Sequence, residues 1–168
     1  MVDAWMSLDV EYAVRLAEAL KSYRVKWLED VLLPEDMDGY ARLRQRLPGV
    51  TLATGEHWYT IHPFAQAASQ GLVDILQPDA LWCGGITASV RICHLAEAYG
   101  LAVIGHAGMN YPYGQHLALA MPAIPMGERS EGVAPPGVPL EEMIALPGTV
   151  PIKNGYVRPT EAPGFGIE

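Results

Sequence analysis

Short apolar runs alternate along the chain with longer stretches whose apolar residues recur at helical spacing. The runs VTLATGEH (50–57) and LAVIGH (101–106) are apolar over several consecutive residues before they reach charged ones. Strands buried on both faces of a parallel sheet have this continuous pattern, whereas half-exposed strands alternate. The stretches 35–48 and 86–100 have the amphipathic spacing of helices. The pattern therefore predicts repeated β/α units and a parallel sheet.

The predicted units repeat regularly enough to favour a (β/α) barrel over an open sheet. Predicted strands end near residues 29, 56, 79, 106 and 128, at intervals of 22 to 27 residues. With another strand that ends at Asp3, residues 1–150 are expected to form a partial barrel of about six strands, and residues 151–168 a tail. No G-x-G-x-x-G motif opens a helix after the first strand, which argues against a dinucleotide-binding fold. Because the chain begins at the last residues of a strand, we expect further sequence upstream.

An ionisable side chain stands at every predicted strand end. In a β/α barrel the carboxyl ends of the strands open into one mouth, where active sites are built. Side chains at these positions would converge in space although more than 120 residues separate the first from the last. One such carboxylate is usually a helix cap or a surface group, but a complete series in register is hard to explain in that way. The six residues are Asp3, Glu29, Glu56, Asp79, His106 and Glu128.

The first three of these residues predict a metal site. Asp3, Glu29 and Glu56 lie at successive strand ends and offer only oxygen ligands, which suits Mg²⁺. Each one alone could be a capping or salt-bridged acid, since acids such as Asp30 are common in this region. Together they would place three negative charges close to one another, and a cation is needed to offset that repulsion.

The other three residues predict proton-transfer chemistry. His106 and Asp79 end neighbouring strands, and an aspartate bonded to an imidazole fixes its tautomer and supports its protonated form. Glu128, at the next strand end, could orient or protonate an oxyanion. His57, beside Glu56, is a candidate contact for the metal ligand or the substrate, with a packing role as the alternative.

These parts together predict a reaction class. Mg²⁺ bound to a substrate carboxylate acidifies the α-proton and stabilises the enediolate that forms when a base removes it. Expulsion of a β-hydroxyl would then dehydrate a hydroxy acid, whereas return of the proton to the other face would give racemisation. A single prominent dyad favours dehydration, because racemisation needs a second base on the opposite face.

Composition limits the partners of the protein. The chain has 168 residues, of which 50% are hydrophobic and 18% charged, as expected for one globular domain. Its net charge of −8 argues against nucleic acid and anionic membranes as partners. That charge is compatible with a divalent cation, but equally with an ordinary acidic protein. Two cysteines without a metal-binding spacing, and the absence of a membrane span, predict a reduced, cytoplasmic protein.

Several motifs resemble one known family. Asp3, WLED (27–30), TGEH (54–57), QPDALWCGGIT (77–87) and the GH pair at 105–106 are similar to motifs of the mandelate-racemase branch of the enolase superfamily. The closing PGFGIE is also similar, so the resemblance extends over essentially the whole chain.

The resemblance implies a fold, a metal and a substrate class. The fold would be the C-terminal part of an enolase-type (β/α) barrel. The six strand-end residues would have family roles, the first three as Mg²⁺ ligands, His106 with Asp79 as the catalytic dyad and Glu128 as a supporting acid. The substrate would be a six-carbon acid sugar, L-rhamnonate or a near relative, converted to the 2-keto-3-deoxy acid.

The sequence departs from the family pattern in one large respect, and three interpretations stay open. Family members carry an N-terminal capping domain and two earlier barrel strands, and the tail at 151–168 would run toward that domain. The chain could be part of an acid-sugar dehydratase, or part of a racemase or epimerase of the same branch. It could also be a truncated, non-catalytic fragment that self-associates. The open sheet edges and the tendency of family members to form oligomers both predict a homo-oligomer.

Overall fold

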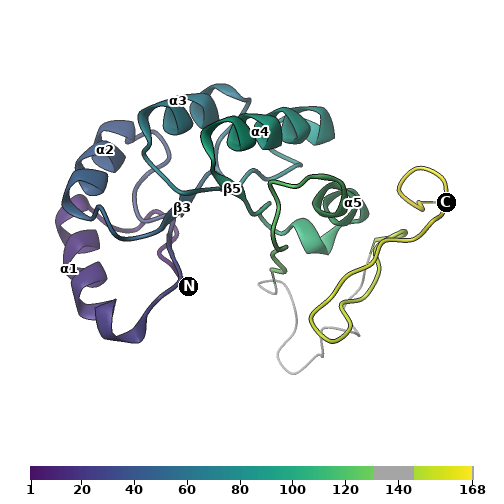
Figure 1. The fold of residues 1–168 in the computed structure, drawn as a ribbon, viewed down its shortest axis with the longest axis horizontal. Coiled ribbons are helices and arrows are strands. Elements are labelled where there is room, and N and C mark those ends of the chain that lie inside the picture. Colours follow the sequence, from purple (N-terminus) through teal and green to yellow (C-terminus); the bar gives the residue numbers. More distant parts are fainter. Residues whose placement is uncertain (131–145, 168) are drawn as a thin grey trace.

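The computed structural model describes residues 1–130 and 146–167 of the chain (Figure 1). Within these residues, five short strands form one parallel sheet in the order β1-β2-β3-β4-β5. Each strand pairs with the next strand along the chain, as in a barrel wall. The strands are β1 (Val2–Asp3), β2 (Leu28–Glu29), β3 (Leu52–Thr54), β4 (Ile75–Leu76) and β5 (Ala102–Val103).

Helices connect the strands and cover one face of the sheet. Figure 1 shows an open arc in which the first four α-helices form the outer side and the strands lie on the inner side. Two short 3₁₀ turns, η1 (Lys21–Tyr23) and η2 (Gly108–Asn110), complete the connections. The α-helices are α1 (Val10–Leu20), α2 (Met37–Arg46), α3 (His62–Gln70), α4 (Gly85–Tyr99) and α5 (Pro112–Ala120).

Local sequence explains where several helices begin and end. The carboxylates of Asp9 and Asp36 accept hydrogen bonds from backbone N–H groups in the first turns of α1 and α2, at 2.7 and 2.8 Å. Such caps satisfy donors that have no partner inside the helix. Helices α3 and α4 end at Gly71 and Gly100, whose φ values of 62° and 69° belong to the left-handed region that glycine adopts without strain.

The core has two layers, one on each face of the sheet. On the outer face, Leu52 and Leu76 are fully buried against helix residues such as Phe64 and Ile92. On the inner face a smaller cluster contains Trp27, Ala53, Ile75 and Ile104. Apolar burial on both faces explains why the strand sequences do not alternate, and it confirms the predicted parallel α/β fold.

The predicted sixth strand is wrong. Residues 125–130 form no strand, and residue 131 lies outside the described residues. The backbone N–H of Met109 in η2 donates to the carbonyl of Glu128 at 2.8 Å, and the side chain of Asn110 pairs with the backbone of Ser130 at 2.9 and 3.1 Å, so this segment is held by η2 and not by a strand ladder. Pro122 and Pro125 lack the N–H groups that a continuous ladder needs.

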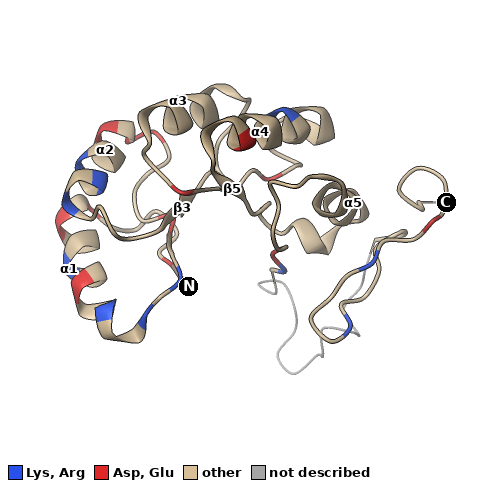
Figure 2. Cartoon of the chain, in the orientation of Figure 1, with Lys and Arg blue, Asp and Glu red and all other residues tan. Residues whose placement is uncertain are grey.

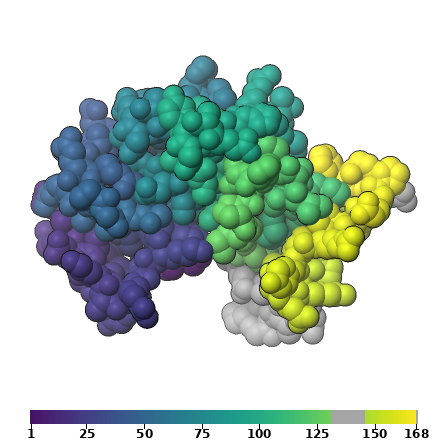
Figure 3. Space-filling view, viewed as in Figure 1, coloured from purple at the N-terminus to yellow at the C-terminus, as the bar shows by residue number. Residues whose placement is uncertain are grey.

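The tail packs against α5 in the described residues. The side chain of Gln115, which is 1% exposed, donates to the carbonyl of Val150 at 2.8 Å and accepts from its N–H at 3.0 Å. The ring of Phe165 lies edge-on to those of Tyr113 and His116. In Figure 3 the tail and the N-terminal segment lie at opposite sides of the molecule. The expectation that the tail packs toward a capping domain stays a prediction.

None of the helices in the described ranges is long and apolar enough to cross a membrane.

Candidate active site

The register of the sheet places the first two predicted ligands side by side. Asp3 on β1 is the register partner of Glu29 on β2, and register partners on neighbouring strands project from the same face. The indole N–H of Trp27, from the inner-face cluster, donates to Glu29 Oε2 at 2.7 Å. Asp3 and Glu29 therefore face the inner side of the arc.

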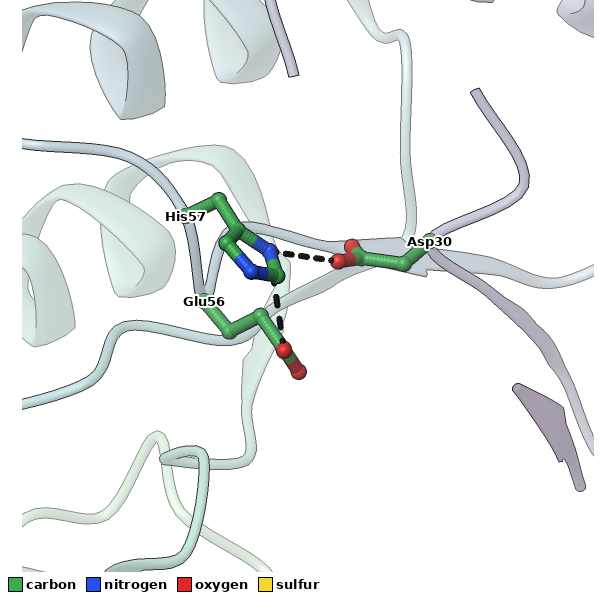
Figure 4. A group of neighbouring side chains, drawn as sticks. All are labelled: Asp30, Glu56 and His57. Atoms are coloured by element: carbon green, nitrogen blue, oxygen red, sulfur yellow. Dashed lines mark hydrogen bonds and ion pairs between the residues drawn. The ribbon is translucent and has the colours of Figure 1, made fainter. Parts of the chain in front are cut away.

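Glu56 lies in a compact group with Asp30 and His57, shown in Figure 4. His57 Nδ1 is 3.1 Å from Asp30 Oδ2 and 3.5 Å from Glu56 Oε1. Thr54 Oγ1 donates to the other oxygen of Asp30 at 2.5 Å. One ligand atom from each member of the group lies within 4.8 Å of the other two. Among the described residues this is the group whose spacing could hold a metal ion as it stands.

The ligand atoms of the three predicted metal ligands lie farther apart than those of this group. Within residues 1–130 and 146–167, the carboxylates of Asp3, Glu29 and Glu56 do not form a set with ligand atoms within 4.8 Å. Asp3 Oδ1 instead accepts from the backbone N–H of Trp5 at 2.8 Å, and Glu29 is held by its indole donor. Repulsion between carboxylates favours such separate hydrogen bonds. The negative charge of Asp3 nevertheless reaches Glu56 and contributes to raising its pKa.

His106 and Asp79 are in direct contact. His106 Nδ1 is 2.8 Å from Asp79 Oδ2, and Asp79 Oδ1 accepts from the backbone N–H of Leu81 at 2.6 Å. The other ring nitrogen, Nε2, is 3.6 Å from Glu56 Oε2. The aspartate thus fixes one side of the imidazole and leaves Nε2 directed into the site.

Glu56 consequently lies between two Asp–His pairs. One oxygen faces His57, which is paired with Asp30, and the other faces His106, which is paired with Asp79. We refer to these five residues as the Glu56 cluster. Two imidazoles therefore face the two oxygens of one buried carboxylate, at 3.5 and 3.6 Å. Each imidazole is a candidate for proton transfer to a ligand bound beside Glu56.

Burial and charge shift the pKa values within the site. Burial raises the pKa of Glu56 to about 7, although the neighbouring His106 works in the opposite direction. Burial alone would lower the pKa of His106, but the hydrogen bond with Asp79 and the charges of Glu56 and Glu128 raise it to about 9. Shifts of this kind gather at functional sites.

Glu128 lies near the dyad but is less completely bonded. Burial raises its pKa, and a backbone hydrogen bond to Ala107 works against that rise. Its Oε2 atom is buried and has no hydrogen-bond partner among the residues that the structure describes. Its charge contributes to the raised pKa of His106. A half-buried acid whose buried oxygen has no partner in the described residues is suited to meet a polar group of a ligand.

The backbone around the site is strained. Several non-glycine residues that follow strands have positive φ values, which cost energy and gather at functional sites. They are Trp5 (42°), Met6 (62°), Asp30 (41°), Thr60 (63°) and Ala107 (48°). Gly55, at the end of β3, has a φ of 133°.

Sequence reasoning missed Asp30 as a site residue. It considered one ionisable side chain per strand end, and Asp30 directly follows Glu29. A signal was available, because WLED and TGEH each place two polar residues at the end of neighbouring strands. The aromatic residues Trp5 and Trp82, which contact His57, were also missed.

Comparison with known proteins identifies relatives that share this fold. The profile of the family described as Enolase C-terminal domain-like matches residues 1–168. An L-rhamnonate dehydratase from Saccharopolyspora erythraea is 42% identical over 170 residues, covering 99% of this chain and 43% of that protein. The crystal structure of rhamnonate dehydratase from Gibberella zeae complexed with Mg aligns with a TM-score of 0.72 and 38% identity, covering 76% of this chain and 31% of that one. The L-talarate/galactarate dehydratase from Salmonella typhimurium LT2 aligns with a TM-score of 0.71 and 32% identity, covering 78% and 32%.

The similarity concerns one region of longer proteins. The chain spans 43% of the length of the Saccharopolyspora relative that it matches. Within the chain, however, the family match is continuous and extends over all 168 residues. The chain belongs to the enolase C-terminal domain-like family, and its parallel sheet with sequential strand order is consistent with that family.

Proposed function

We propose that this chain carries the metal-binding and proton-transfer residues of an acid-sugar dehydratase. The reaction is the Mg²⁺-dependent loss of water from a six-carbon acid sugar, L-rhamnonate or a near relative, to give the 2-keto-3-deoxy acid through an enediolate. The observation that carries the proposal is the position of Glu56 between two imidazoles, each held by an aspartate. The rhamnonate and talarate/galactarate dehydratases among the relatives support the substrate class.

The donor set fits a hard divalent cation. Asp3, Glu29 and Glu56 supply oxygen atoms only, and a cation would relieve the cost of ionising Glu56, whose pKa is raised to about 7 by burial. Mg²⁺, when bound, stabilises negative charge that develops on the substrate carboxylate. The group of Asp30, Glu56 and His57 includes a nitrogen, which suits Zn²⁺ or other transition metals better than Mg²⁺.

The proposed proton transfer depends on His106. Asp79 holds its Nδ1 atom, so Nε2 is the atom that can take the α-proton of the substrate. The protonated imidazole can then donate to the departing β-hydroxyl, because the paired aspartate stabilises its positive charge. Glu128, with one buried oxygen free of protein partners in the described residues, is proposed to orient or protonate the developing oxyanion.

The second Asp–His pair favours an alternative function. Racemisation or epimerisation needs bases on both faces of the α-carbon, and His57 with Asp30 could supply the second base. In the dehydratase, His57 is proposed to contact the substrate. Incubation with L-rhamnonate in D₂O separates the two functions, since the dehydratase forms a keto acid and the racemase forms a deuterated epimer.

Calorimetric titration with Mg²⁺, in the presence and absence of L-rhamnonate, tests the proposal directly. We expect Mg²⁺ binding that strengthens with the acid sugar, a loss of Mg²⁺ affinity of at least about tenfold in Glu56→Gln, and metal binding that is retained in His106→Asn. His106→Asn should abolish exchange of the α-proton. Exposed residues of the same types on α4 provide the matched controls Glu97→Gln and His94→Asn. If the parent chain binds no Mg²⁺ under either condition, the carboxylates do not form a site and the non-catalytic interpretation is correct.

Assembly and location follow as smaller proposals. The outer edges of β1 and β5 have no strand partner within the described sheet, which favours association into a homo-oligomer. Cys83 and Cys93 are both buried and free, as expected of a protein that works in the reducing cytoplasm.

A further inference from the structure

We propose that Asp30, Glu56 and His57 form a second metal site, which takes Zn²⁺ or a similar transition metal and thereby removes Glu56 from the Mg²⁺ ligands. The inference goes beyond the proposed function, because Zn²⁺ binding to these residues requires neither an acid sugar nor catalysis. The three residues follow β2 and β3, whereas the proposed Mg²⁺ ligands extend to Asp3 on β1. Glu56 is the residue that the two sets share.

The spacing of the three side chains is close to that of ligands around four-coordinate zinc. Zn–N and Zn–O bonds of about 2.0–2.2 Å at tetrahedral angles separate two ligand atoms by roughly 3.3–3.5 Å. His57 Nδ1 is 3.1 Å from Asp30 Oδ2 and 3.5 Å from Glu56 Oε1. All three ligand atoms lie within 4.8 Å of one another, and Figure 4 shows the side chains directed toward a common space. Three protein ligands leave the fourth position of the metal for water.

Burial and charge favour a cation at this position. Asp30 and Glu56 are 2% and 8% exposed, so two carboxylates share a space with little access to solvent. They form ion pairs with the imidazoles of His57 and His106, while Figure 2 shows Lys and Arg on the outer helices α1, α2 and α4. A protonated imidazole brings one positive charge, whereas a divalent metal brings two. The metal therefore offsets the repulsion between the carboxylates more completely.

Contacts around the group hold two of its ligands in place. Thr54 Oγ1 donates to Asp30 Oδ1 at 2.5 Å, which leaves Oδ2 for the metal. The rings of Trp82 and Trp5 lie edge-on to His57, with centroid distances of 5.5 and 6.4 Å, and limit the rotation of the imidazole. Ligands that are oriented by outer hydrogen bonds are typical of protein metal sites, and loss of such an outer partner lowers metal affinity about 10- to 100-fold.

The nitrogen ligand distinguishes the two metals. Imidazole is a good ligand for Zn²⁺, while Mg²⁺ prefers oxygen atoms in octahedral geometry. Asp3 and Glu29 supply such oxygens on the inner side of the sheet, whereas His57 supplies the nitrogen at the end of β3. Because Glu56 serves both sets, Zn²⁺ at the second site should weaken Mg²⁺ binding as much as loss of this ligand does, by at least about tenfold. Zn²⁺ would then inhibit any Mg²⁺-dependent step at Glu56.

Metal titrations of the full, metal-free chain with its cysteines kept reduced test the inference. We expect one Zn²⁺ per chain by competition with a chromophoric chelator, and Co²⁺ in its place should show the visible absorption of four-coordinate Co²⁺. His57→Asn and Asp30→Asn should lower Zn²⁺ affinity by more than about 100-fold and Thr54→Val by about 10- to 100-fold, while all three retain Mg²⁺ binding by calorimetry. His94→Asn, at an exposed histidine on α4, is the matched control and should change the affinity for neither metal.

The outcomes separate this inference from the proposed function. If the parent chain binds Zn²⁺ but none of the three variants weakens that binding, the ion binds elsewhere and the inference fails. Six-coordinate Co²⁺, or an affinity for Mg²⁺ that saturating Zn²⁺ leaves unchanged, would also overturn it. If no Zn²⁺ binds, His57 is held by hydrogen bonds alone, and the inference fails while the dehydratase proposal stands. If Zn²⁺ binds as expected but Mg²⁺ does not bind with or without L-rhamnonate, the second site is supported and the proposed function fails.

Discussion

Asp79→Asn tests the electrostatic account of the dyad. The rise in the pKa of His106 from 6.5 to about 9 corresponds to about 3 kcal/mol in favour of the imidazolium in the folded protein. The hydrogen bond with Asp79 is the largest contribution that raises this pKa, and a hydrogen bond to a charged group is worth about 1.5–3 kcal/mol. Asparagine keeps the shape and an acceptor oxygen but removes the charge. We therefore expect the pKa of His106 to fall well below 9 in the variant.

The sign of the pH dependence follows from the same shift. Because the pKa of His106 is raised in the folded state, its stabilising contribution is fully present below pH 6.5 and is lost as the pH rises through about 9. Asp79→Asn should lose stability at pH 6 and show a smaller further loss up to pH 9.5. Titration of the imidazole by NMR and urea unfolding at both pH values, without divalent metal, measure these effects.

A matched control and a clear refutation are available. Asp38→Asn changes an exposed aspartate on α2 and should move neither the pKa of His106 nor the pH dependence of unfolding. If the pKa of His106 in Asp79→Asn equals that of the parent, Asp79 does not stabilise the imidazolium. The distance of 2.8 Å between the two side chains would then have no energetic meaning.

Three further predictions concern the cluster, the β3 turn and the tail. Without metal, the free energy of unfolding should fall between pH 4.5 and about 7 because Glu56 ionises at higher pH when folded, and urea melts of Glu56→Gln should lack this fall. Gly55→Ala should lower the free energy of unfolding by about 1–3 kcal/mol, since φ is 133° and the new Cβ would lie 2.7 Å from Phe64. Gly49→Ala is the control, because its Cβ would meet nothing within 4 Å, and equal urea midpoints for the two variants would contradict this reasoning. Gln115→Ala should release both bonds to the backbone of Val150, just before the tail, so hydrogen exchange near residue 150 should accelerate while that of β3 stays unchanged.

The sequence pattern was sufficient for the architecture but not for every element. Continuous apolar runs at β3 and β4 reflect burial on both faces, which periodicity records directly. The segment near residue 128 has similar spacing from its neighbour, yet two prolines remove the donors that a strand needs. The spacing between predicted strands contains no information about missing backbone N–H donors.

The site was predictable where a side chain simply follows its strand. His106 and Asp79 meet because neighbouring parallel strands end side by side. Asp30 was missed because its position depends on a left-handed backbone conformation, with φ of 41°, that no hydrophobic period reveals. The open arrangement of Asp3 and Glu29 follows from hydrogen bonds with Trp5 and Trp27, which depend on side-chain geometry.

The shared position of Glu56 couples cation uptake to acidity. One of its oxygens lies 3.6 Å from Nε2 of His106, so the carboxyl and this imidazole titrate as one system, with pKa values that belong to the pair. A cation that binds the carboxylate would expel the proton that Glu56 retains near neutral pH, and it would lower the pKa of His106 because the charge of Glu56 helps to raise that pKa. The site would then act as an exchanger of cations for protons, and the heat of metal binding would change with the ionisation enthalpy of the buffer.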